Sequence, residues 1–253
     1  MPRVSAAGRS LEYRQIGDRQ SARPVLVFLH EGLGSIRQWR DFPAAVSAAT
    51  GCPAIVYDRY GYGQSEVLEG PRTGEFMHDE ALIAFPEIRK NLQIENPILI
   101  GHSDGASIAL IHAGRHRVRG VVAMAPHVFI EPICLTAIEA AARTFETSDL
   151  PAKLGRYHRD AAKTFFGWAD TWRETGFKSW DIRVDFLPGI RCPVLAIQGH
   201  DDGYGSMAQL DEIARCAGGP VELLKLESCG HAPFRDQPEA VLSAVSSFVK
   251  QLG

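Results

Sequence analysis

The stretch PILIGHSDG, residues 97–105, decides the fold of this chain. Its apolar first half has the length and composition of a buried β-strand. Its second half places Ser103 between Gly101 and Gly105, just before a helix-like segment. A serine in this context either caps an ordinary helix or occupies a nucleophile elbow, a sharp turn between strand and helix. The elbow favours glycine two residues before and two residues after the serine, because side chains there would collide with backbone. Both positions are glycine, which favours the elbow.

Apolar runs of strand length recur along the chain. They span residues 25–30, 53–58, 97–102, 120–126, 194–199 and 221–227. Each run is nearly continuous in apolar residues, as in strands that are buried on both faces. Helix-like segments separate the runs, at residues 76–92, 106–116 and 241–252. This alternation predicts an α/β fold, in which a mostly parallel central sheet carries helices on both faces. The more polar stretch LEYRQIG, residues 11–17, is expected to add an antiparallel edge strand.

Residues 131–190 interrupt this alternation with helix-like pieces and no strong strand pattern. Three of the four tryptophans lie there: Trp168, Trp172 and Trp180. An insertion of this size in an α/β fold is usually functional. We therefore expect a core domain formed by residues 1–130 and 191–253, and a helical lid formed by residues 131–190. The aromatic side chains either pack the lid itself or line a pocket beneath it.

Bulk composition argues against several classes of protein. The 253 residues are 45% hydrophobic and 23% charged with a formal net charge of −3, so no nucleic-acid partner is expected. No apolar run is long enough to cross a bilayer and no signal-peptide pattern is recognised, so no membrane partner is expected. The five cysteines are scattered and lack the C-x-x-C spacing of a metal site. We expect reduced thiols, a cytoplasmic location and no metal.

An alcohol is a weak nucleophile, so Ser103 needs a base, a carboxylate that orients the base, and donors for the developing oxyanion. In an open α/β sheet these groups belong in loops at the carboxyl ends of strands. The loop after the last predicted strand, SCGHAPF, holds His231, and histidine is the usual general base near neutral pH. The loop after the preceding strand, HDDGYG, holds two acids. Asp202 is the expected orienting carboxylate, and Asp201 is the alternative.

The loop HEGLGS, which follows the first buried strand, is a candidate for the oxyanion site. We expect one donor to be the N–H of Gly32, with Leu33 as the alternative, since glycine lets the backbone approach a bound oxygen. The N–H of Asp104, at the positive end of a helix dipole, is the expected second donor. An ordinary glycine-rich turn is the competing interpretation. His30 is expected to brace this loop. Glu31 is expected either to point away from the site or to be paired, because a carboxylate would oppose the developing charge.

These motifs resemble those of the α/β-hydrolase superfamily, from about residue 11 to the C-terminus. LHEGLGS resembles the family's histidine–glycine oxyanion loop, YDRYGYGQS its structural aspartate–arginine–glycine stretch, GHSDG its elbow, QGHDD its acid loop and CGHAPF its histidine loop. The chain order of serine, acid and histidine is also the one expected for the family. Glu31 is a departure, because the family often has glycine there. A serine nucleophile argues against relatives such as haloalkane dehalogenases and soluble epoxide hydrolases, which use a carboxylate.

The residues and the resemblance together imply a serine hydrolase that cleaves a small carboxylic ester or thioester through an acyl-enzyme. No metal or organic cofactor is needed. Three other reactions of the same groups stay open: C–C bond hydrolysis, acyl transfer and a lyase reaction. A ligand-binding protein that retains a hydrolase-like site is a further alternative.

The expected partner is a small ester-type molecule. Leu33, His127, Trp168 and Trp172 are candidate contacts to it, and for the last three a purely structural role is the alternative.

Overall fold

The strands form a single mixed sheet in the computed structural model, which describes residues 1–253 apart from the side chain of residue 175. Within the described chain the eight strands are β1 (Arg3–Ala6), β2 (Arg9–Ile16), β3 (Leu26–Leu29), β4 (Ala54–Tyr57), β5 (Ile98–His102), β6 (Gly120–Met124), β7 (Val194–Gly199) and β8 (Val221–Leu226). Their spatial order is β1-β2-β4-β3-β5-β6-β7-β8. Strands β3 to β8 run parallel, whereas β2 pairs antiparallel with β4 and β1 antiparallel with β2. The predicted α/β fold is confirmed.

Two expectations about the sheet edges are wrong. The stretch 11–17 does contribute to an antiparallel strand, β2, but β1 pairs along its outer side, so β2 is not the edge. The run 221–227 forms the opposite edge strand, β8, in which most side chains are exposed or half-buried. Its Glu222 and Lys225 are exposed because, among the described residues, no further strand pairs along its outer side; Lys225 reaches Asp211 at 2.7 Å.

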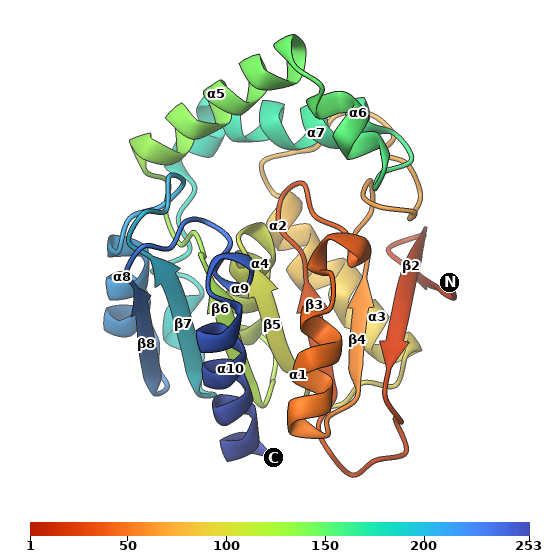
Figure 1. Ribbon diagram of the computed structural model, residues 1–253, viewed down its shortest axis with the longest axis vertical. Coiled ribbons are helices and arrows are strands. Elements are labelled where there is room, and N and C mark those ends of the chain that lie inside the picture. The colour runs from red at the N-terminus through yellow and green to blue at the C-terminus, as the bar shows by residue number, and fades with distance from the viewer.

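Helices cover both faces of the sheet (Figure 1). They are α1 (Phe42–Thr50), α2 (Phe76–Asp79), α3 (Phe85–Asn91), α4 (Asp104–Ala113), α8 (Ala208–Cys216), α9 (Pro233–Asp236) and α10 (Pro238–Leu252). On one face α1 and α10 pack together, and their Val46 and Val245 join the buried side chains of β3 and β5. On the other face α3 and α4 contribute Phe85 and Ile108 to a second apolar cluster. Short 3₁₀ turns lie at Ile36–Trp39, Thr175–Ser179 and Leu187–Gly189.

One helical prediction needs a correction in detail. The helix-like segment 76–92 is helical, but its middle, Glu80–Ala84, is a π-helical turn between α2 and α3. Such turns widen a helix locally and are rare. The hydrophobic pattern did not indicate it, because it changes the repeat by only one residue.

The parallel register brings the carboxyl ends of the central strands to one edge of the sheet. Leu29 of β3 pairs with Gly101 of β5, and Met124 of β6 pairs with His102. Further along, Gly199 of β7 pairs with Leu226 of β8. The loops that follow β3, β5, β6, β7 and β8 therefore all open at this edge, which is where ligands bind in sheets of this kind.

Three helices from the inserted segment lie over that edge (Figure 1). They are α5 (Pro132–Thr147), α6 (Leu150–Gly155) and α7 (Ala161–Arg173). All three fall within the segment 131–190 that we expected to form a lid. The chain leaves the sheet after β6 and returns to it before β7, and Phe129 and Asp181 form a bridge where the two ends pass each other.

Among the described residues, the helices are all too short or too polar to cross a membrane.

Candidate active site

Ser103 lies at the turn between β5 and α4 with φ 54° and ψ −121°, a backbone conformation that is strained for a residue with a side chain. A Cβ at Gly101 would overlap the backbone of Gly105 and Ala106, and a Cβ at Gly105 would overlap the carbonyl of Leu29. Both glycines are therefore required by the close approach of α4 to the sheet. This is the elbow geometry, and the Ser103 hydroxyl makes no cap of the ordinary helical kind.

A hydrogen-bonded relay joins three loops at this point. His231 Nε2 lies 3.0 Å from Ser103 Oγ, and His231 Nδ1 lies 2.8 and 2.9 Å from the two carboxylate oxygens of Asp202. Since the carboxylate can only accept, Nδ1–H donates to Asp202, which leaves the Nε2 lone pair to accept from the Ser103 hydroxyl. Residues that are 128 and 29 positions apart in the chain are thus placed in one line of proton donors and acceptors.

Two further groups hold the acid of this relay. Gln198 Nε2 donates to Asp202 Oδ2 at 2.9 Å, and the Tyr204 N–H donates to Oδ1 at 2.8 Å. Burial, the largest single effect, raises the pKa of Asp202, but the hydrogen bond and charge of His231 together with the Tyr204 N–H and His127 outweigh it and hold that pKa below its usual range. The alternative acid, Asp201, is exposed and takes no part in the relay. Sequence reasoning did not single out Gln198, because a glutamine at a strand end has no distinctive pattern.

Two backbone N–H groups that we expected to serve as oxyanion donors, those of Gly32 and Asp104, have no acceptor among the described residues. The Asp104 N–H stands at the first position of α4, where no intrahelical acceptor exists. The carbonyl of Leu33, the alternative to Gly32, accepts from His158 Nε2 of the lid segment at 2.9 Å. This contact fixes the orientation of the loop.

His30 braces the same loop, as expected. Its Nδ1 lies 2.7 Å from the carbonyl oxygen of Glu31, and its Nε2 accepts from the Arg59 N–H at 3.1 Å. The Arg59 guanidinium reinforces the loop by donating to the carbonyls of His30 and Glu31 at 3.2 and 2.8 Å. Burial lowers the pKa of His30 well below its usual range, so the ring is neutral. His30 therefore supports the loop and takes no place in the relay.

Glu31 lies beside the residue that precedes the nucleophile, and its nearest basic groups belong to His102 and Arg235. One carboxylate oxygen lies 3.3 Å from His102 Nδ1, and the other lies 3.7 Å from Arg235 Nη2. On the far side of its ring, His102 Nε2 lies 2.6 Å from the carbonyl oxygen of His231. Because that carbonyl can only accept, His102 donates to it and thereby ties the loop of His231 to the elbow.

Comparison with known proteins agrees with this geometry. The family model described as "Alpha/beta hydrolase family" matches residues 26–244, which span most of the chain. This chain belongs to the α/β-hydrolase family. A curated relative, the proline iminopeptidase of Lactiplantibacillus plantarum, is 31% identical over 115 residues. That match covers 45% of this hydrolase and 39% of the relative, so the similarity spans well under half of the relative's length.

Solved structures resemble this hydrolase over nearly its whole length. The enol-lactonase from Burkholderia xenovorans LB400 has a TM-score of 0.75 at 24% identity, and the match covers 98% of this chain and 99% of the other. MGS-M2, an α/β hydrolase from a Medee basin deep-sea metagenome, has a TM-score of 0.80 at 18% identity, with 98% and 96% covered. At these identities the likeness shows the shared fold.

Lid side chains cover the relay of this hydrolase from above. The indole nitrogen of Trp168, on α7, lies directly over Gly32, where a Cβ would overlap it. One turn further along α7, the Trp172 ring packs edge-on against His127 with 5.1 Å between ring centroids. The His127 ring in turn lies 6.1 Å from that of His231. Three of the four candidate substrate contacts therefore gather around the relay, and the fourth, Leu33, lies in the adjoining loop.

Tyr204 is a neighbour that sequence reasoning missed. Its ring lies 4.6 Å from the His231 ring, centroid to centroid, and it follows the acid by two residues. Its position in the loop HDDGYG, next to the expected acid, was the available signal.

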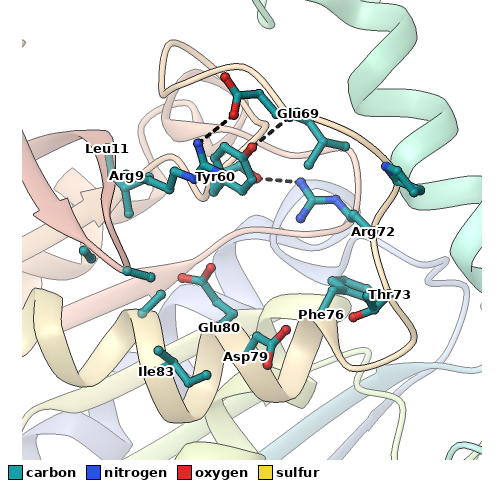
Figure 2. Close-up of a pocket in the computed structure, with 15 residues that line it drawn as sticks. Arg9, Leu11, Tyr60, Glu69, Arg72, Thr73, Phe76, Asp79, Glu80 and Ile83 are labelled. Carbon is teal, nitrogen blue, oxygen red and sulfur yellow. Dashed lines mark hydrogen bonds and ion pairs between the residues drawn. The ribbon is translucent and has the colours of Figure 1, made fainter.

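A separate cavity lies away from the relay (Figure 2). It measures about 350 Å³ and is bounded by the N-terminal hairpin, the loop 60–73 and α2. Arg72 extends over it and donates to the Tyr60 carbonyl, while Arg9 is held by Glu69. The relay residues take no part in its lining.

Proposed function

We propose that this chain is a serine hydrolase that cleaves a small carboxylic ester or thioester through an acyl-enzyme intermediate. The hydrogen-bonded line from Ser103 through His231 to Asp202 is the single observation that carries the proposal. The strained elbow supports the same proposal, as do the backbone N–H groups of Gly32 and Asp104, which have no acceptor among the described residues.

The reaction would run in two halves. His231 Nε2 takes the hydroxyl proton as Ser103 Oγ attacks the carbonyl carbon, and Asp202 stabilises the imidazolium that forms. The N–H groups of Gly32 and Asp104 bind the oxyanion. His231 returns the proton to the leaving alcohol or thiol, then activates water to release the acid from the serine. Loss of one oxyanion donor typically costs about 2.7–4 kcal/mol in the barrier.

The test is covalent labelling. A fluorophosphonate should label the unmodified protein on Ser103, and Ser103→Ala should abolish both labelling and the turnover of a short-chain chromogenic ester. Ser243→Ala, at an exposed position of α10, is the matched control and should keep both. Turnover that persists undiminished in Ser103→Ala contradicts the proposal.

A second candidate function is amide hydrolysis at an N-terminal residue. It is favoured by the curated relatives, whose name is proline iminopeptidase. Release of nitroaniline from proline p-nitroanilide, lost in Ser103→Ala, would distinguish it from ester hydrolysis alone.

We also propose that the protein works in a reducing, cytoplasmic compartment, and the free thiols of all five cysteines support this.

A further inference from the structure

Four buried polar atoms around Ser103 have no hydrogen-bond partner within the described chain. They are Oδ2 of Asp104, Nδ1 of His127, and Nε1 of both Trp168 and Trp172. Buried polar groups in native proteins are nearly always paired, so a cluster of unpaired ones needs an explanation. These four belong to residues at the elbow, beside the relay and on the lid face above it, which is where a bound molecule would complete their hydrogen bonds.

Asp104 is the most informative of the four. It follows Ser103 directly, and only 1% of it is exposed to solvent. Its nearest cation, Nη2 of Arg59, lies 3.9 Å from Oδ2, which is beyond hydrogen-bond distance. The Trp168 indole N–H is close enough to favour the charged carboxylate, yet it does not reach hydrogen-bond geometry. One carboxylate oxygen of Asp104 is therefore buried without a hydrogen-bond partner among the described residues.

The negative charge of the Asp104 carboxylate would repel the developing oxyanion unless the substrate offsets it. Burial raises the pKa of Asp104 to about 6, against the opposing effect of Arg59, so the group is ionised near neutral pH. A negative charge beside the proposed oxyanion site opposes the charge that develops on an ordinary ester. A substrate group that donates a hydrogen bond to Asp104 would offset this repulsion, and an unsubstituted alkyl chain would not.

The position of the donor on the substrate follows from the chain geometry. The N–H of Asp104 is proposed to bind the oxyanion. Only two carbon atoms, Cα and Cβ, separate that nitrogen from the carboxyl carbon of the same residue. A group that contacts this carboxylate while the carbonyl oxygen contacts the N–H must therefore sit close to the carbonyl carbon.

We propose that Asp104 determines substrate specificity, by binding a hydroxyl or ammonium group on the carbon next to the scissile carbonyl. This rests on the proposed function, since it names the acyl group that Ser103 accepts. Hydroxyl and ammonium share the chemistry of a hydrogen-bond donor, and the substrates below separate them.

The experiment uses three phenyl esters with one carbon skeleton: propionate, 2-hydroxypropionate and 2-aminopropionate, the last two in both enantiomers. Phenol release gives kcat/KM for each. The unmodified protein should prefer one of the two donor-bearing esters over propionate. Asp104→Asn should lower that preference by about 10- to 100-fold, the worth of one hydrogen bond to a charged group. Asp185→Asn, at an exposed position, should leave the preference unchanged.

A second measurement needs no substitution. In the unmodified protein the preference for the 2-hydroxy ester should fall as the pH is lowered through about 6, because the Asp104 carboxylate is then protonated. The inference is overturned if the unmodified protein does not prefer a donor-bearing ester over propionate, or if Asp104→Asn keeps that preference. The pH measurement decides the question even if Asp104→Asn unfolds more easily. Failure of fluorophosphonate to label Ser103 instead removes the proposed function, and this inference with it.

Discussion

Position 32 must be glycine because of a side chain that lies more than a hundred positions away in the chain. A Cβ at Gly32 would overlap the indole nitrogen of Trp168, so the loop after β3 and the lid helix α7 can meet here only if this residue is glycine. The sequence showed that Gly32 suits a close backbone approach, but not that a lid tryptophan makes it. The contact depends on how α7 is rotated over the sheet, which no local pattern encodes.

Gly32→Ala should therefore destabilise the protein through its contact with Trp168. We expect a loss of about 1–3 kcal/mol in the free energy of unfolding, which is typical of overpacking. In a Trp168→Ala background the same substitution should cost less than about 0.5 kcal/mol, because the overlap is gone. Urea unfolding of the four proteins measures this coupling. Equal costs in both backgrounds would show that the indole is not the obstacle.

At the scale of elements, strands with two covered faces were the most predictable parts of the fold. β3 to β7 follow the apolar runs to within two residues at each end, since full burial leaves a continuous apolar signature. The edges were harder. β1 has only four residues, too few to show a period, and the apolar run of β8 did not show that its Glu222, Leu223 and Lys225 are exposed at the edge of the sheet.

The residues of the site that lie in loops directly after strands were predictable from the sequence. Ser103, Asp202 and His231 each follow a strand whose carboxyl end lies at the same edge of the sheet, so their meeting follows from the parallel topology. Trp168 and Trp172 could be named as candidates but not placed, because their positions depend on lid packing.

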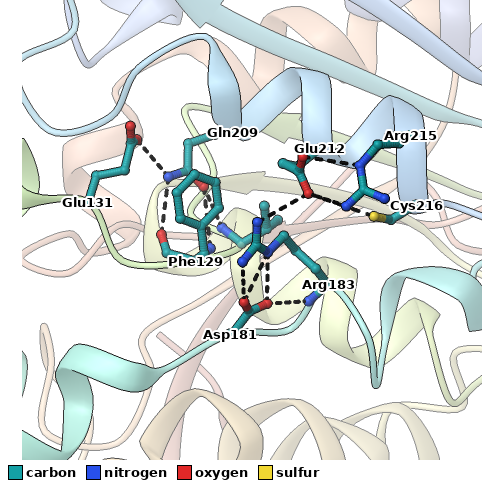
Figure 3. Close-up of polar contacts among 9 residues, drawn as sticks. Phe129, Glu131, Asp181, Arg183, Gln209, Glu212, Arg215 and Cys216 are labelled. Atoms are coloured by element: carbon teal, nitrogen blue, oxygen red, sulfur yellow. Dashed lines mark hydrogen bonds and ion pairs between the residues drawn. The ribbon is translucent and has the colours of Figure 1, made fainter.

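The two ends of the lid segment are fastened to α8 (Figure 3). Gln209, fully buried, accepts from the Val128 N–H at 2.7 Å and donates to the Phe129 carbonyl at 3.1 Å and to Glu131 at 2.7 Å. At the other end, Arg183 of the returning chain pairs with Glu212 of α8 at 3.2 Å. These contacts make α8 the anchor of the lid.

Removal of the Gln209 side chain should loosen this anchor. Gln209→Ala leaves the Val128 N–H and the Phe129 carbonyl without partners, and we expect a loss of about 2–4 kcal/mol in the free energy of unfolding. Amide hydrogen exchange should accelerate at residues 128–131 more than in β5 or β6. Gln251→Ala, at an exposed position of α10, is the control. Uniform acceleration across the sheet would argue against a local anchor.

For the whole molecule, buried ionisable groups set the response to acid. Burial lowers the pKa of His102 to about 4 and that of His112 and His127 to about 3. Each of these rings is neutral when folded but takes up a proton near pH 6.5 when unfolded, so its contribution to stability is lost as the pH falls below about 6.5. Burial acts in the opposite direction on Asp58 and Asp104, whose pKa rises to about 6. Their contribution is largest in acid and is lost as the pH rises through about 6.

The three histidines should decide the sign of the change in the free energy of unfolding, because their pKa values shift further than those of the two carboxyl groups and because they are more numerous. We expect the free energy of unfolding to fall by on the order of 5 kcal/mol between pH 7 and pH 4. Urea denaturation at intervals of one pH unit measures the curve. Stability that stays level or rises towards pH 4 would mean that the carboxyl groups dominate instead.

The bridge between Phe129 and Asp181 has a consequence for how this architecture can diversify. An insertion that departs and returns at neighbouring points behaves as a detachable module, because changing its length adds little to the entropy of closing the loop. The pairing of the β-strands that carry the reacting groups does not depend on this segment, although the loops above the strands contact it through Trp168, Trp172 and His158. Related proteins can thus differ in the lid, and therefore in the substrates that reach the site, while the residues below the lid stay the same.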